Sequence, residues 1–161
     1  MSEIEELLER FRRGPEVVAV AITGAAGRKL DHHPAPGKWS VRQILCHLLD
    51  AELVGATRFR RVIAEEKPRL EDYDQDAWAN GLHYEQRRVS NVMELFRKLR
   101  AANHALLSEL SEKDFARTGD HAARGVVTLR DLLVLYVEHT EAHAAQMQEA
   151  RHAYKASQAA G

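Results

Sequence analysis

Two histidines, His139 and His143, stand four residues apart in a run that its neighbours predict to be helical. Positions four apart lie on one face of a helix, with Cβ atoms about 6 Å apart, so two imidazoles can reach one metal ion. The residues between them do not follow the HExxH pattern that makes this spacing diagnostic. A metal site here therefore requires another ligand from elsewhere in the chain.

His47 is the candidate for that ligand, since it lies at the edge of the apolar stripe of an earlier predicted helix. Three neutral imidazoles suit one divalent ion such as Zn²⁺ or Ni²⁺ and leave a coordination position open. An open site can supply hydroxide from water at neutral pH, or can bind and activate a thiolate. The competing interpretation is that the three histidines are polar edge positions on amphipathic helices.

Other side chains near these histidines have two interpretations each. Asp50, one turn after His47, could orient its imidazole, serve as a fourth ligand, or be an exposed acid. Gln146, one turn beyond His143, faces either the metal pocket or solvent. His121 lies in the loop before the last predicted helix and could reach the mouth of the metal site. Arg58 lies about 16 Å from His47 along the helix, so it could pair with an acid or with a distal substrate group.

The elements that must position these residues are predicted to be four long amphipathic helices. Ser2, Ser40 and Thr128 are candidate N-caps, each followed three residues later by a Glu, Gln or Asp. The apolar spacing predicts helices over residues 2–13 (continuing, after a break at Gly14–Pro15, to about residue 27), 40–64, 85–110 and 128–154. The fold class is therefore all-α, a four-helix bundle.

Short elements fill the connections between these helices. Residues 69–83 form a polar segment held by Tyr73, Trp78 and Leu82, with a short helix, and a single turn surrounds Phe115. Residues 117–127 form a loop, and no segment alternates in the way that predicts a strand.

Composition narrows the function classes. The 161 residues suit one domain, 1–161, and the 23 basic and 24 acidic residues are interspersed, which argues against nucleic acid as a partner. The single cysteine, Cys46, excludes an intramolecular disulfide and reads as a small buried side chain. No apolar run could span a membrane, and the acidic start does not resemble a secretory signal, so we expect a cytoplasmic protein.

Several motifs together resemble the DinB-like family. The run KWSVRQILCHL at residues 38–48 is similar to its opening motif, and YVEHTEAH at 136–143 is similar to its closing one. The segments KPRLEDYDQDAW at 67–78 and LSEKDFAR at 110–117 resemble the YfiT-type subgroup, described as metal-dependent hydrolases. The resemblance covers about residues 35–150. The sequence departs from the subgroup around the last motif, where Glu141, Ala142 and Gln146 replace a histidine-rich surrounding.

The resemblance implies an up-down-down-up bundle, a homodimer, and a divalent metal held by His47, His139 and His143. Some relatives in this family transfer or isomerise with a low-molecular-weight thiol (bacillithiol, mycothiol or glutathione) as co-substrate. Three hypotheses follow. The chain is a metal-dependent hydrolase of a small-molecule substrate, a metal-dependent thiol S-transferase, or a non-enzymatic dimeric metal-binding stress protein. We place the hydrolase first because of the subgroup resemblance.

Overall fold

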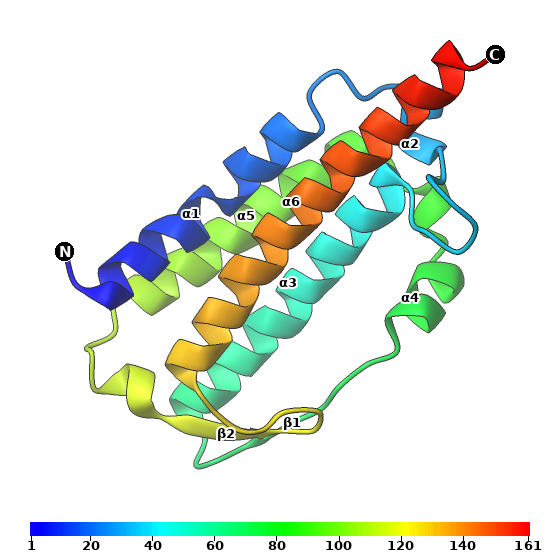
Figure 1. The fold of residues 1–161 in the computed structure, drawn as a ribbon. Coiled ribbons are helices and arrows are strands. Elements are labelled where there is room, and N and C mark those ends of the chain that lie inside the picture. The colour runs from blue at the N-terminus through cyan, green and yellow to red at the C-terminus, as the bar shows by residue number, and fades with distance from the viewer.

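Four long helices run side by side through the computed structural model, which describes residues 1–161 (Figure 1). They are α1 (Glu3–Ala21), α3 (Val41–Ala64), α5 (Val89–Ser108) and α6 (Leu129–Ala159). The connections contain the short helices α2 (Arg28–Asp31) and α4 (Gln75–Gly81), 3₁₀ turns at Tyr84–Gln86 and Asp114–Ala116, and the strands β1 (Arg69–Leu70), β2 (Thr118–His121) and β3 (Gly125–Thr128).

The order of directions is up, down, down, up. Helices α1 and α6 run one way and α3 and α5 the other, because residues 65–88 return along the length of the bundle before α5 begins (Figure 1). Helix α6 packs against α1 and α3, and α5 packs against the same two helices. Parallel neighbours therefore alternate with antiparallel ones, and the predicted four-helix bundle is confirmed.

The three predicted N-caps are confirmed, and each forms a complete capping box. In each box the hydroxyl of the cap residue accepts from the backbone N–H three residues later, and the side chain of that later residue accepts in return from the backbone N–H of the cap. The pairs are Ser2 with Glu5 in α1, Ser40 with Gln43 in α3, and Thr128 with Asp131 in α6. Local sequence alone therefore sets where three of the four long helices begin.

Helix α1 continues through Pro15 and is one helix, whereas the sequence predicted a break there. Proline lacks an N–H, so the carbonyl of Phe11, four residues earlier, loses its helical partner. Arg100 Nη1 of α5 donates to that carbonyl at 2.9 Å. Gly14 makes this approach possible, because a Cβ at that position would collide with Arg100 Nη1. A distant arginine therefore replaces the missing hydrogen bond.

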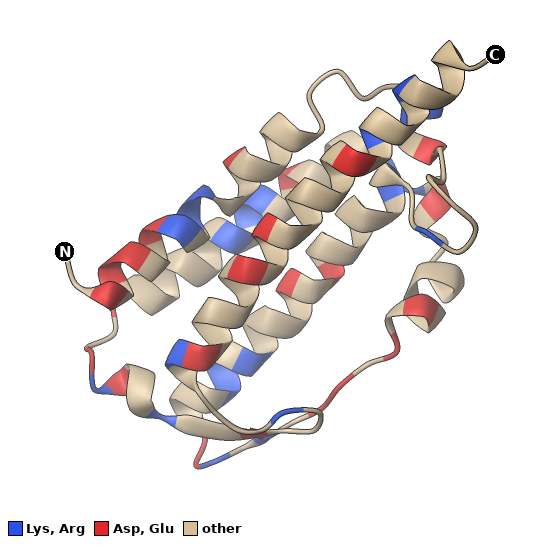
Figure 2. Ribbon diagram, in the orientation of Figure 1, with Lys and Arg blue, Asp and Glu red and all other residues tan.

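The core consists of two apolar clusters, one toward each end of the bundle. One includes Val18, Ile44, Phe96 and Met147, and the other includes Phe11, Phe59, Leu107 and Leu133. Buried polar side chains of three helices lie between them at mid-height; these are Glu52, Arg100, Asn103 and Thr140. We call these four residues the mid-bundle network. Over the rest of the bundle acidic and basic residues are interspersed (Figure 2).

The mid-bundle network is bonded through its charged groups. Arg100 Nη2 donates to Glu52 Oε2 at 2.7 Å and to Thr140 Oγ1 at 2.9 Å, and Asn103 Nδ2 donates to Glu52 Oε1 at 2.9 Å. The Arg100 guanidinium also lies 3.9 Å from the ring centroid of Phe11. Each buried charge thus has an opposite partner, as burial demands.

Three short strands form a sheet at the end of the bundle where α6 begins, which corrects the prediction of a loop over residues 117–127 (Figure 1). Strand β1 pairs parallel with β2, and β2 pairs antiparallel with β3, with Gly119 opposite Val127. Gly125 adopts a φ of 74°, which glycine tolerates, and so begins β3 after the turn. No helix is long and apolar enough to cross a membrane.

Candidate metal centre

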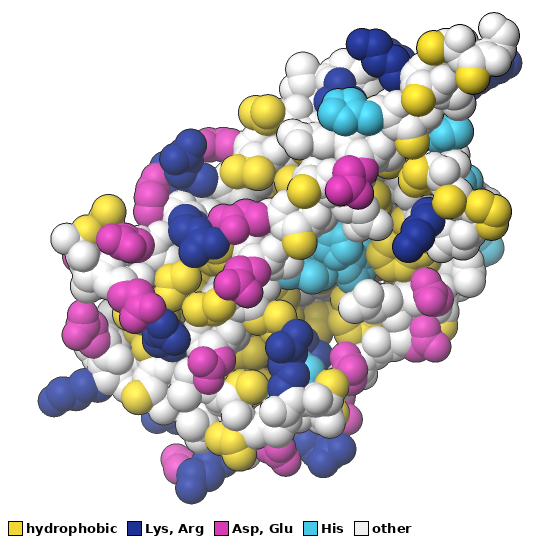
Figure 3. Space-filling view, viewed as in Figure 1, with side chains coloured by type: hydrophobic (Ala, Val, Ile, Leu, Met, Phe, Trp, Pro, Cys, Tyr) yellow, Lys and Arg dark blue, Asp and Glu magenta, His cyan; other side chains and the backbone are white.

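The three predicted histidines meet on the face between α3 and α6. His47 is fully buried, and His139 and His143 are half-buried. His139 Nε2 lies 3.0 Å from His47 Nε2 and 3.1 Å from His143 Nε2. A ligand atom from each residue lies within 4.8 Å of the other two. Figure 3 shows histidine side chains gathered in a hollow of this face.

Two of the three nitrogen separations fit a shared divalent ion. Two imidazole nitrogens bound to one ion at about 2.0–2.1 Å stand roughly 2.9–3.4 Å apart, depending on whether the angle between them is octahedral or tetrahedral. The two short separations fall in that range. Three neutral imidazoles cannot all donate to one another, because each carries a single N–H. An ion at the common point would satisfy all three nitrogens.

Burial keeps the three imidazoles neutral, which is the form that binds metal. Desolvation, with a smaller effect of His143, lowers the pKa of His47 to about 4. Desolvation, followed by the neighbouring histidines and Arg100, lowers the pKa of His139 to about 3. Desolvation also lowers the pKa of His143, although Gln146 opposes the shift. Lone pairs are therefore available across the neutral range.

Gln146 and Trp39 hold two of the rings in place. Gln146 Oε1 lies 2.7 Å from His143 Nδ1, which places the ring proton on Nδ1 and leaves Nε2 free for a ligand role. The Trp39 ring lies 5.0 Å from the His47 ring, centroid to centroid. His47 Nδ1 is buried and has no hydrogen-bond partner. Gln146 was a sequence candidate; Trp39 was noticed only as part of a motif.

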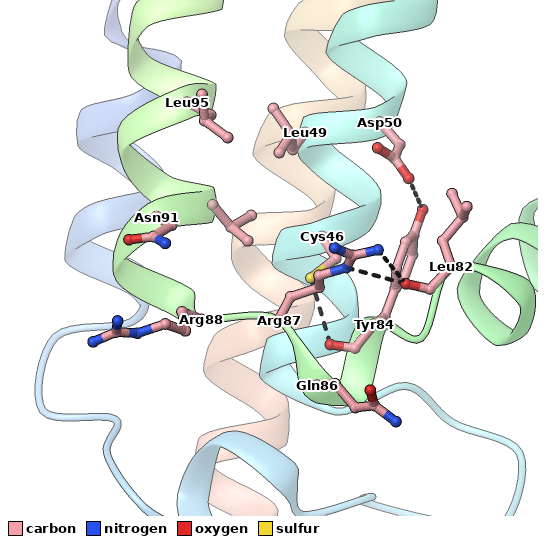
Figure 4. Close-up of a pocket in the computed structure, with 11 residues that line it drawn as sticks. Cys46, Leu49, Asp50, Leu82, Tyr84, Gln86, Arg87, Arg88, Asn91 and Leu95 are labelled. Carbon is pink, nitrogen blue, oxygen red and sulfur yellow. Dashed lines mark hydrogen bonds between the residues drawn. The ribbon is translucent and has the colours of Figure 1, made fainter.

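Asp50 is engaged elsewhere. Its carboxylate accepts from the hydroxyl of Tyr84, and burial raises the pKa of that carboxyl. It makes no hydrogen bond to His47, so the structure does not bring the two together. Cys46 is buried as predicted and donates to the Tyr84 carbonyl at 3.7 Å, and desolvation raises its pKa to about 12. Both residues border a cavity of about 510 Å³ beside α5 (Figure 4).

A smaller cavity of about 210 Å³ borders one of the three histidines, His139, and its wall includes Arg58 and His121, two residues singled out in the sequence. His139 is part of its wall, together with Tyr136 and Arg124. Arg58 is buried, and its Nη1 donates to the Tyr136 hydroxyl at 3.2 Å. His121 is buried too, and its Nδ1 accepts from the N–H of Ala123 at 3.1 Å. His121 thus borders the same cavity as His139.

The histidine pattern, the bundle topology and the motifs agree with a comparison against known families. The profile of the DinB superfamily matches residues 10–147. The chain belongs to the DinB superfamily. The matched range contains all of α3 and α5 and the larger part of α1 and α6.

Relatives in this superfamily are described as metal-dependent hydrolases. The chain is 29% identical over 147 residues to the "Putative metal-dependent hydrolase YfiT" of Bacillus subtilis, covering 91% of this chain and 79% of the relative. A protein of the same description from Oceanobacillus iheyensis is 27% identical over 147 residues, covering 91% and 81%.

Two solved structures share the fold. YfiT from Bacillus subtilis, described as "a probable metal-dependent hydrolase with an unusual four-helix bundle topology", superposes with a TM-score of 0.87 at 27% identity, over 93% of this chain and 87% of that one. A mycothiol-dependent maleylpyruvate isomerase superposes with a TM-score of 0.73 at 15% identity, over 91% and 61%. The second likeness establishes the fold alone.

Proposed function

We propose that this protein is a metal-dependent hydrolase of a small-molecule substrate, with one divalent ion, Zn²⁺ or Ni²⁺, held by His47, His139 and His143. The observation that carries the proposal is the convergence of three neutral imidazoles beside a cavity. A structural site would use a fourth protein ligand, whereas three ligands leave a position for water or substrate. The description of the YfiT relatives supports the same reaction class.

A divalent ion in such a site supplies a Lewis acid and lowers the pKa of a coordinated water to about 7. The residues of the chain have three tasks around it. Gln146 fixes the tautomer of His143, Trp39 covers the His47 ring, and Tyr136 presents a hydroxyl that Arg58 orients toward the cavity wall. Such groups, held by their own hydrogen bonds, position a substrate without reorganising.

A thiol S-transferase is the second candidate. The mycothiol-dependent enzyme with the same fold favours it, since a site with an open position could also activate the thiolate of a co-substrate. A non-enzymatic dimeric metal-binding stress protein is the third. We also propose a homodimer in the cytoplasm, on the resemblance and on the absence of a membrane-spanning helix.

Metal content is the first test. Tag-free protein purified without added metal should contain close to one equivalent of a divalent ion by elemental mass spectrometry. Single variants His47→Ala, His139→Ala and His143→Ala should each lose it. His152→Ala, at an exposed position of the same helix α6, is the matched control and should retain it. Absence of metal from the parent, also after reconstitution with several ions, contradicts the proposal.

Turnover separates the enzyme classes. The reconstituted protein is assayed against ester, amide and phosphoester panels, each with and without glutathione, bacillithiol or mycothiol. Hydrolysis without thiol, abolished by chelation and restored by metal, supports the hydrolase. Turnover only with thiol supports the transferase, and metal binding without any turnover supports the third candidate.

A further inference from the structure

The 210 Å³ cavity beside His139 has more positive than negative charge in its wall. Arg58 and Arg124 contribute two guanidiniums, and Asp72 contributes the single carboxylate. His121 is neutral near pH 7, since desolvation, followed by the charge of Arg58, lowers its pKa. The remaining polar groups of the wall are uncharged. The cavity therefore has a net positive charge before any metal ion is added.

Arg58 is a permanent charge that the protein neutralises only in part. Its side chain is buried, its Nη2 donates to the Glu71 carbonyl at 2.6 Å, and its Nε has no partner. The carboxylate of Asp72 lies 3.8 Å from Nη2, beyond hydrogen-bond distance, and is half exposed. A guanidinium cannot shed its proton, so burying one without a close anion is costly. An anion in the adjoining cavity would offset that cost.

Two donors of the wall are free to bind such an anion. Arg124 is exposed in the turn between β2 and β3, and its guanidinium forms no ion pair or side-chain hydrogen bond. His121 accepts at Nδ1 from Ala123, so its single ring proton is on Nε2, which has no protein partner. A guanidinium fork and a ring N–H together suit the oxygens of a carboxylate or phosphate.

We infer that the cavity binds the anionic group of a small substrate, a carboxylate or phosphate, through Arg124 and His121, with Arg58 supplying fixed positive charge. This inference rests on the proposed hydrolase and names its substrate class. A volume of about 210 Å³ is smaller than the 300–1,000 Å³ usual for drug-sized ligands, which indicates a compact molecule. The anion anchors the substrate while its reacting bond lies toward His139.

Binding is measured first on the metal-free protein, so that the result is independent of turnover. Calorimetric titrations compare benzoate and phenyl phosphate with benzamide, which resembles benzoate in shape but has no charge. At least one of the two anions should bind at least 10-fold more tightly than benzamide. A hydrogen bond to a charged group is worth about 1.5–3 kcal/mol. Arg124→Gln should therefore lower the affinity for that anion about 10-fold or more and leave the affinity for benzamide unchanged.

Two further variants refine this test. His121→Asn removes the Nε2–H while keeping an acceptor for the N–H of Ala123, and should lower the affinity for the anion about 3- to 10-fold. Arg97→Gln, an exposed arginine of α5 without a side-chain partner, is the matched control and should bind as the parent does. Equal binding of both anions and benzamide, no binding of either anion, or an unchanged Arg124→Gln variant overturns the inference.

Turnover then connects the inference to the reaction. The metal-loaded protein should hydrolyse 4-acetoxybenzoate with a kcat/KM at least 10-fold above that for its methyl ester, and Arg124→Gln should remove the difference. Equal kcat/KM values for the two esters overturn the substrate class. Failure to hydrolyse either ester contradicts an esterase activity and leaves the anion titration, made without metal, as the separate measure of the site.

Discussion

Two polar clusters lie beside each other in the middle of the bundle, and they differ in what completes them. In the mid-bundle network, Glu52 and Arg100 bond to each other and to Asn103 and Thr140. In the histidine cluster, three Nε2 atoms have only one another as partners, and His47 Nδ1 has none. The chain itself neutralises the first cluster, whereas the second is complementary to something the chain does not supply.

The two clusters share helix α6, where Thr140 follows His139 directly. One side of the helix therefore supports stability and the adjacent side supports binding. Polar residues buried at similar depth can thus serve different purposes. Each cluster leaves one buried nitrogen without a partner, Arg100 Nε and His47 Nδ1, but only the network pairs its charged groups with each other. Loss of a network residue should cost stability, and loss of a cluster histidine should cost metal.

The largest expected effect is the loss of unfolding free energy when the mid-bundle network is broken. Arg100→Ala leaves the Glu52 carboxylate buried without a cation and the Phe11 carbonyl without a donor. Breaking a buried pair by removing one partner costs about 3–5 kcal/mol, so the free energy of unfolding should fall by that amount in urea titrations. The double variant Glu52→Met, Arg100→Met should lose less, because no charge is left unpaired. A loss of under 1 kcal/mol in Arg100→Ala would contradict the comparison.

The next effect is a pH dependence of stability to which the histidine cluster contributes and the mid-bundle network does not. His47 has a pKa of about 4 in the folded protein against about 6.5 when unfolded, so below pH 6.5 the unfolded chain binds the proton first. The contribution of His47 to the stability of the metal-free protein is therefore full above about pH 6.5 and is lost as the pH falls toward 4. The loss at pH 5.5 is on the order of 1 kcal/mol per histidine.

Urea titrations at several pH values check this dependence. His139→Gln removes one of the shifted groups, since the pKa of His139 is lowered to about 3. Its stability should therefore decline less steeply between pH 6.5 and 5.5 than that of the parent. The exposed His152→Gln is the control, and an identical slope in all three proteins would refute the assignment.

Metal should stabilise the folded protein only through the histidine cluster. At a free ion concentration about 100 times Kd, the unfolding free energy should rise by about 2.7 kcal/mol. His47→Ala should show no gain, whereas Glu52→Gln should keep the full gain although it starts from a lower stability. The measurement compares unfolding curves with excess ion and with chelator. Loss of the gain in both variants would contradict the independence of the two clusters.

The smallest effect concerns the support of one ligand. Gln146→Ala removes the acceptor at His143 Nδ1, and loss of such a partner costs about 10- to 100-fold in metal affinity. Unfolding of the metal-free protein should change by less than 1 kcal/mol, because Gln146 is only half-buried. Competition with a chromophoric chelator measures the affinity, and Gln148→Ala, an exposed position of the same helix, is the control.

Local chemistry was readable from the sequence, and distant pairing was not. The caps Ser2, Ser40 and Thr128 depend on residues three positions away, so they were predicted correctly. The three histidines were found because their spacing and the family motifs mark them. The sheet was missed because β1 and β2 lie about 50 residues apart and β1 has only two residues, too few for any alternation.

The mid-bundle network was missed for a related reason. Glu52 and Arg100 are residue types usually found on exposed helix faces, and nothing near them in the sequence marks their burial. On α5 the apolar Leu95 is 55% exposed, while the polar Arg100 and Asn103 are buried. The burial of Arg100 is explained by a distant contact, because Pro15 leaves the Phe11 carbonyl without a helical donor and Arg100, 89 residues after Phe11, donates to it.

The long separation of the cluster histidines along the chain determines when, during synthesis, the cluster can form. His47 and His139 are separated by 92 residues, and the last helix supplies two of the three cluster histidines. A chain still emerging from the ribosome without α6 offers one histidine of the three, and closing so long a separation is slow compared with forming a single helix. Any ion that occupies all three histidines is therefore acquired only after α6 has been synthesised and has packed against α3, from the pool available to the folded bundle.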